Sequence, residues 1–160
     1  MCLVSLLALL VACAPREYVS CRAVLYAMMK AEIALPAGQV YDLSAPEGDS
    51  EYFDERIINS LWGEGSPPPM RQGWIDLALF LPSSGHPCEL AVFLCDSPDT
   101  ATDTARLLCR RLDVIRSNKK NAEYSAMLDS ASVTIVGNYV ILAISSDAEK
   151  AIKIAREVIK

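Results

Sequence analysis

The sequence has only one histidine, His86, and this scarcity limits the chemistry that it can support. A hydrolase with a histidine base would have to use His86, but Ser83 and Ser84 lie in the same short turn-like stretch. The members of a catalytic triad normally meet through the fold instead. A zinc site on His86 and Cys88 would have H-x-C spacing, which matches no common ligand pattern. We therefore interpret His86 as a solvated turn residue and expect no metal, no cofactor and no catalytic residue.

Other signatures of catalysis and of large ligands are also missing. The chain has no P-loop, no G-x-G-x-x-G and no G-x-S-x-G. Lys and Arg number 15 against 20 Asp and Glu, for a net charge of −5, which argues against nucleic acid as a partner. A thiol hydrolase that pairs His86 with Cys88 or Cys95 is the minor alternative to a non-enzymatic protein.

No apolar run approaches the roughly 20 residues that a transmembrane helix needs. The longest, LVSLLALLVA at 3–12, has about the length of the apolar core of a signal peptide. It ends in LVAC at 10–13, which resembles the lipobox of bacterial lipoproteins, although residues 1–4 lack the usual Lys or Arg. We predict a signal peptide at 1–12, a diacylglycerol (typically with palmitate chains) on Cys13, and a tether at 13–19. The alternative is an apolar helix start that packs on the domain.

This interpretation places the protein on the extracytoplasmic face of the cell membrane, held there through the lipid on Cys13. Two acyl chains suffice for stable anchoring, whereas one holds only weakly. Four cysteines would remain besides Cys2 and Cys13. We expect them to be buried thiols, because Cys21 and Cys109 occupy apolar positions of predicted helices. Cys88 and Cys95, at the two ends of one predicted strand, would lie roughly 23 Å apart, too far for a disulfide.

The remaining chain, 20–160, is predicted to form a single α+β domain. With 52% apolar and 22% charged residues it can build a core, and its length suits one domain. Hydrophobic periodicity predicts an N-terminal helical pair and then two strand–strand–helix units. The helical pair lies at 21–33 and 51–62, with a loop at 36–50; the units comprise 74–81, 89–95 and 97–117, and 132–136, 139–145 and 145–160. We expect a four-stranded antiparallel sheet with the helices of both units on one face.

The opposite face of that sheet is predicted to be unusually apolar. Strand alternation assigns to it a set of large side chains: Trp74, Phe80, Phe93, Tyr139 and Ile141. A sheet face that meets water should be polar, so something must cover this one. Two candidates fit: the N-terminal helical pair, or a protein partner or second copy that uses the five residues as an interface.

Two charge clusters invite a functional interpretation, and we favour a structural one for both. The acidic cluster at 46–55 does not have the ligand spacing of an EF-hand loop, and negative charge suits the start of a helix. The basic residues are interspersed with acidic ones on a predicted helix, which is typical of a solvated face. They are Arg106, Arg110, Arg111, Arg116, Lys119 and Lys120.

The chain resembles small lipoproteins of Gram-positive bacteria whose domain has no known function. The resemblance lies in LVAC at 10–13, the helix that ends in CRRLDVIRSN, and the spacing from Tyr124 to ASVTIVGNYVILAISSDAEKA. Gly137, Asn138, Tyr139 and Val140 match a G-[ND]-Y-V hairpin turn. The resemblance implies this location and fold and implies no activity, cofactor or catalytic residue.

The sequence thus predicts an extracytoplasmic, membrane-anchored lipoprotein that is a non-enzymatic protein-binding or scaffolding module. The first alternative is a small-solute-binding accessory of a transporter, which requires a concave apolar pocket with a few polar groups. The second alternative is the hydrolase.

Overall fold

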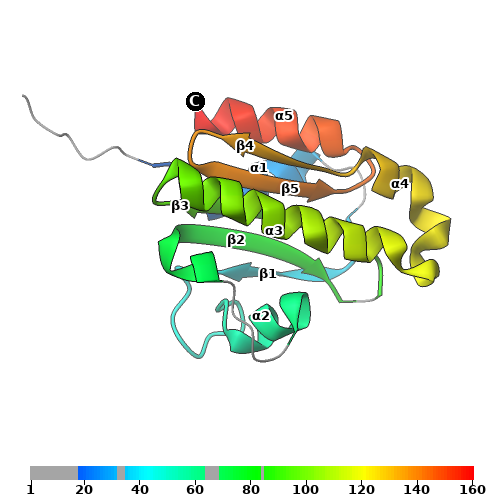
Figure 1. The fold of residues 1–160 in the computed structure, drawn as a ribbon, viewed down its shortest axis with the longest axis horizontal. Coiled ribbons are helices and arrows are strands. Elements are labelled where there is room, and N and C mark those ends of the chain that lie inside the picture. Colours follow the sequence, from blue (N-terminus) through cyan, green and yellow to red (C-terminus); the bar gives the residue numbers. More distant parts are fainter. Residues whose placement is uncertain (1–17, 32–34, 64–68, 84) are drawn as a thin grey trace, which may run out of the picture.

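The centre of the protein is a five-stranded antiparallel sheet with strand order β1-β2-β3-β5-β4. A computed structural model describes residues 18–31, 35–63, 69–83 and 85–160 (Figure 1). The strands are β1 (Gly38–Asp42), β2 (Trp74–Pro82), β3 (Glu89–Cys95), β4 (Ser132–Val136) and β5 (Tyr139–Ile144). The helices are α1 (Cys21–Ala31), α2 (Glu55–Trp62), α3 (Pro98–Ser117), α4 (Ser125–Ser130) and α5 (Ala148–Ile159), with 3₁₀ turns at Pro69–Gly73 and Lys119–Tyr124. The class is α+β, as the sequence predicts.

The prediction of four strands was wrong, because β1 lies in the segment interpreted as a loop. Its sequence, GQVYD, begins and ends with residues that are depleted in strands, Gly38 and Asp42. Gly38 is required at its start, since a Cβ there would come within 2.5 Å of the Leu81 carbonyl oxygen and of the Phe80 ring. The strand is therefore specified by its close pairing with β2 rather than by its own propensity.

The helices of the two strand–strand–helix units lie on opposite faces of the sheet, which corrects the expectation that they share one. On one face α1 and α5 pack against each other and against the sheet, while α3 and α2 cover the other face (Figure 1). The error arose in β3, where every residue is buried. A strand buried on both faces shows no polar alternation from which its inward side could be assigned.

The starts of α1 and α3 agree with the sequence within one residue, whereas α2 and α5 begin four and three residues later than predicted. The Ser97 hydroxyl accepts a hydrogen bond from Thr100 N in α3, and the Asp147 carboxylate accepts one from Lys150 N in α5. Asp54 and Ser20 accept equivalent bonds from Ile57 N and Ala23 N. Each bond satisfies a backbone donor that the first turn of a helix leaves unpaired.

The signal peptide and the lipidated cysteine are predictions for residues 1–13, which lie outside the described residues. Among the described residues, no helix combines the length and the apolar character needed to span a bilayer.

Candidate functional site

The five side chains predicted to form an interface are all core residues. Trp74, Phe80, Phe93, Tyr139 and Ile141 are at most 6% exposed. They also do not share a face: Trp74 and Phe93 lie in the α2–α3 core, whereas the other three lie in the α1–α5 core. The covering elements are the protein's own helices on both sides, so this surface is not available to a partner.

Both the ring and the Nε1–H group of Trp74 have partners within the protein. Its ring contacts those of Phe53, Trp62 and Phe93 at centroid distances of 6.4, 6.0 and 4.8 Å. Its Nε1–H donates to the buried Thr104 hydroxyl at 2.8 Å. The residue therefore fixes α3 to the sheet through both packing and a hydrogen bond.

His86 is half-buried rather than solvated. Its Nδ1 accepts a hydrogen bond from Cys88 N at 3.1 Å, and its ring lies 4.5 Å from that of Tyr124. Since Nδ1 has a single lone pair, it accepts from this peptide group instead of from a thiol. The two rings help to line a cavity of about 530 Å³ at the end of β5, together with Leu35 and Met127.

The cysteines form no disulfide with one another among the described residues. Cys21, Cys88 and Cys95 are buried, as predicted, but Cys109 is exposed because it lies on the outward side of α3. Burial raises the pKa of Cys21, and the Asp76 carboxylate beside it raises that pKa further. Burial likewise raises the pKa of Cys95. These two thiols are therefore poor nucleophiles.

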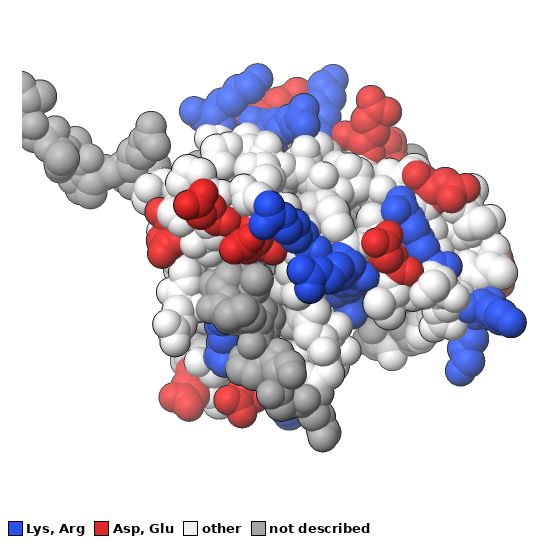
Figure 2. All heavy atoms as spheres, in the orientation of Figure 1, with Lys and Arg blue, Asp and Glu red and all other residues white. Residues whose placement is uncertain are grey.

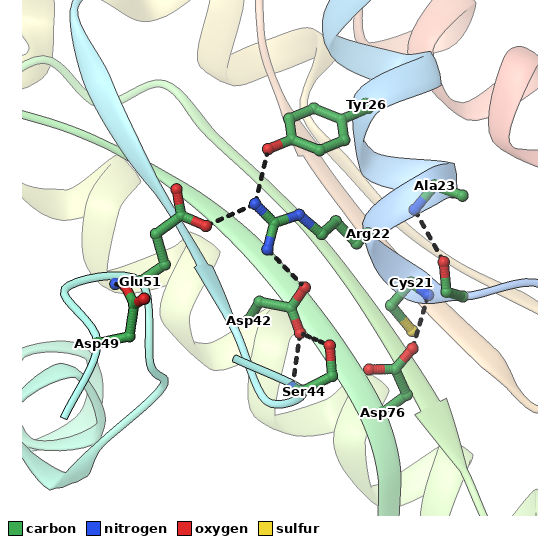
Figure 3. Close-up of polar contacts among 10 residues, drawn as sticks. Cys21, Arg22, Ala23, Tyr26, Asp42, Ser44, Asp49, Glu51 and Asp76 are labelled. Atoms are coloured by element: carbon green, nitrogen blue, oxygen red, sulfur yellow. Dashed lines mark hydrogen bonds and ion pairs between the residues drawn. The ribbon is translucent and has the colours of Figure 1, made fainter. Parts of the chain in front are cut away.

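The acidic segment at 46–55 contacts α1 through Glu51 (Figure 3). Arg22 of α1 donates to Glu51 and to the fully buried carboxylate of Asp42, which also accepts from Ser44 N at 2.7 Å. Asp54 caps α2. Within the described part of the chain, no three His, Cys, Asp or Glu side chains come together as metal ligands. Two members of the cluster, Glu51 and Asp54, thus have cationic partners, Arg22 and Arg56.

The basic side chains of α3 are only partly the solvated face that we expected. Figure 2 shows acidic and basic groups interspersed over this helix. Arg111, however, forms a two-pronged ion pair with the buried Glu89, with Nε 2.8 Å from both carboxylate oxygens, and donates to Leu61 O. Arg116 donates to Leu128 O and Ala131 O. These two arginines therefore hold neighbouring elements together.

One edge of the sheet, β1, is partly covered by the protein's own chain. Asp42 N donates to Glu51 O, and Phe53 N donates to Asp42 O. The Gln39 side chain reaches Ser50 O at 2.7 Å. The segment 50–53 therefore takes up the outward backbone groups of Asp42, at one end of this edge strand.

The other edge, β4, ends the sheet with no strand beyond it among the described residues. Val136 and Tyr139 pair across the two-residue Gly137-Asn138 turn, and such a pair exchanges both of its hydrogen bonds. Bonded and non-bonded pairs alternate along the strands, so Val133 and Ile135 direct their N–H and C=O groups away from β5. The sequence of β4, SVTIV, contains none of the lysines or prolines that commonly protect an edge.

A groove runs along this open edge, between β4 and α5. Its volume is about 770 Å³, and its walls include Thr134, Ile152, Lys153 and Arg156. The Arg156 guanidinium donates to the Thr134 hydroxyl at 3.0 Å across the floor of the groove. On the opposite side of the sheet, Ile135 is 45% exposed. An extended chain added to β4 would place alternate side chains in the groove and over Ile135.

The sequence predicts β4 as a strand but does not indicate that it is a binding edge. The edge depends on β3 pairing with β5, a contact between strands that are distant in sequence. SVTIV lacks the Lys and Pro residues that protect edge strands. This absence indicates an open edge only once the strand order shows that β4 lies at the edge of the sheet.

The chain has no match among known families or proteins. A scan against models of protein families, a search of curated proteins and a search of solved structures each found none. The proposed function therefore depends on the geometry and on the N-terminal motif.

Proposed function

We propose that the protein is a lipid-anchored, extracytoplasmic protein-binding module that holds an extended segment of a partner at the β4 edge. The anchor is proposed from LVAC at 10–13, with Cys13 as the lipidated residue. The observation that supports binding is the contrast between the two sheet edges. Among the described residues, segment 50–53 covers the Asp42 end of β1, whereas no strand lies beyond β4, which borders a groove.

Strand addition fits this edge physically. Backbone hydrogen bonds to Val133 and Ile135 would provide affinity that does not depend on sequence, and the groove would select side chains. The basic residues Lys153, Arg156 and Lys160 and the acidic residues Glu149 and Glu157 line the groove. A partner strand with β-branched residues and mixed charge would complement both parts of the surface.

The test is site-specific photo-cross-linking in cells that export the full-length chain. A benzophenone amino acid at Ile135 should give an adduct, whereas the same group at Val114 should not. Val114 is a matched control because it is exposed and apolar but lies on α3. Val133→Pro should abolish the adduct because it removes an outward N–H, and Val133→Ala should retain it. Equal adducts at Ile135 and Val114, or none at Ile135, would contradict the proposal.

A second candidate function is small-solute binding, which the cavity beside His86 and Tyr124 favours. Its volume of about 530 Å³ lies within the range of small-molecule sites, roughly 300–1,000 Å³. Native mass spectrometry of the full-length chain, released gently from membranes, tests it. If the natural chain carries an additional mass that Met127→Trp lacks, the cavity binds a ligand. If the natural chain carries no additional mass, small-solute binding is contradicted.

A further inference from the structure

We propose that the segment bound at the β4 edge is β4 of a second copy of this chain. The two copies would form one continuous sheet with five strands from each. The inference rests on the proposed function, because it names the partner of the surface assigned there.

The backbone of β4 is complementary to itself. A two-fold axis that passes between the two Thr134 residues places Val133 of one copy opposite Ile135 of the other, on both sides of the axis. These are the residues whose N–H and C=O groups point outward. Each such pair exchanges two hydrogen bonds, so the junction would form about four. A strand of only five residues is thereby paired along its whole outer edge.

The side chains suit the same register. On the α3 side of the sheet, Ile135 would pack against Val133 of the second copy, which covers an apolar side chain now 45% exposed. On the α5 side, the two Thr134 residues would face each other directly. Threonine pairs and β-branched pairs across neighbouring strands are both stabilising, by about 0.2–1 kcal/mol each.

The charges at the two ends of α5 are also self-complementary. The helix runs beside β4 in the same direction, and its 12 residues span about 18 Å against about 17 Å for the five of β4. The axis between the two Thr134 residues therefore lies level with the middle of α5 and makes the two helices antiparallel. In that arrangement Glu149 approaches Lys160 of the other copy, while the two Lys153 residues, next to the axis, approach each other. Figure 2 shows the basic side chains over α5 at this margin of the molecule.

The arrangement also suits two lipid anchors. Since the axis is perpendicular to the sheet, the α1–α5 layers of both copies lie on the same side. Val19, whose carbonyl accepts from the Tyr139 hydroxyl at 2.7 Å, enters α1 in that layer. Both tethers then start on one side of the joined sheet, so both Cys13 lipids can enter one bilayer.

The experiment is disulfide cross-linking of the full-length chain in membranes, in a Cys109→Ser background that removes the exposed native thiol. In the proposed register the two Thr134 Cα atoms lie about 4.5 Å apart, within the range of a disulfide. The two Ser132 Cα atoms lie about 14 Å apart, which a disulfide cannot bridge. Thr134→Cys is therefore the test variant and Ser132→Cys its matched control on the same strand.

Mild oxidation with copper phenanthroline should convert Thr134→Cys to a covalent dimer at least about tenfold more than Ser132→Cys. Because Ser132 would face Val136 of the second copy, the double variant Ser132→Cys/Val136→Cys should also cross-link, and either single variant should not. Equal cross-linking of Thr134→Cys and Ser132→Cys, or none in Thr134→Cys and the double variant, would overturn the inference. If the Ile135 photo-adduct then contains a different protein, the second copy is excluded while the proposed function stands.

Discussion

Substitution of Trp74 tests whether its side chain belongs to the core or to an interface. We expect Trp74→Asp to unfold the protein. The ring is 6% exposed and contacts three aromatic rings. Removing a buried tryptophan costs about 3–5 kcal/mol, and a buried carboxylate adds a desolvation penalty. Domains are typically stable by about 5–15 kcal/mol, so this loss takes most or all of the stability.

Milder substitutions give a measurable magnitude. Thr104→Val keeps the volume but leaves Trp74 Nε1–H buried without an acceptor, at a cost of about 1–3 kcal/mol. Trp74→Phe loses the same hydrogen bond and part of the ring, for about 2 kcal/mol. Because both variants remove one bond, the double variant should cost less than the sum of the singles, by about 1 kcal/mol.

The assay is urea unfolding of the full-length chain in mild detergent, followed by circular dichroism, with size-exclusion chromatography of each variant. A Trp74→Asp protein that remains cooperatively folded but loses self-association would refute the core assignment. Additive costs for Trp74→Phe and Thr104→Val would refute the hydrogen bond as the link between them.

Three further predictions follow from the described contacts. Arg111→Met should cost about 3–5 kcal/mol in urea unfolding because it leaves Glu89 buried and unpaired, and Glu89→Met in the same chain should restore much of the loss; no recovery would contradict this. Asp54→Asn should match the natural chain at very low pH and be less stable near pH 7, because the hydrogen bond and charge of Arg56 lower the pKa of Asp54. Asp54 thus stabilises the fold above its unfolded pKa of about 3.9 and loses that contribution as the pH falls through its lower folded pKa, so a difference that is independent of pH would oppose this assignment. Iodoacetamide should label Cys109 in the folded protein and spare Cys95 until denaturant is added, as peptide mass mapping can check, and equal labelling would show that Cys95 is accessible.

The parts of the fold that follow from local patterns were predicted correctly. The period and caps of α3 and α5 and the Gly137-Asn138 hairpin are properties of short segments, and the structure confirms them. The strand β1 was missed because Gly38 and Asp42 have low strand propensity. Their contacts with residues distant in sequence explain their presence in the strand.

The site was harder to predict because it depends on strand order and on burial of both sheet faces. In β3 all seven residues are buried, so alternation could not separate its two sides, and Phe93 was assigned to the wrong face. Arg111 was interpreted as solvated because its buried partner, Glu89, begins a distant strand. The strand β4 lies at the edge because β5 pairs with β3 on its other side, and this pairing of distant strands could not be predicted from the sequence.

The central claim is that a lipid on Cys13 holds this domain at the outer face of the membrane. Its most direct test is the intact mass of the protein extracted from membranes, for the natural chain and for Cys13→Ser. We expect a species that begins at Cys13 and carries a diacylglycerol, and we expect the variant to lack it. An unmodified full-length chain in the soluble fraction would contradict the claim and return residues 1–13 to the fold.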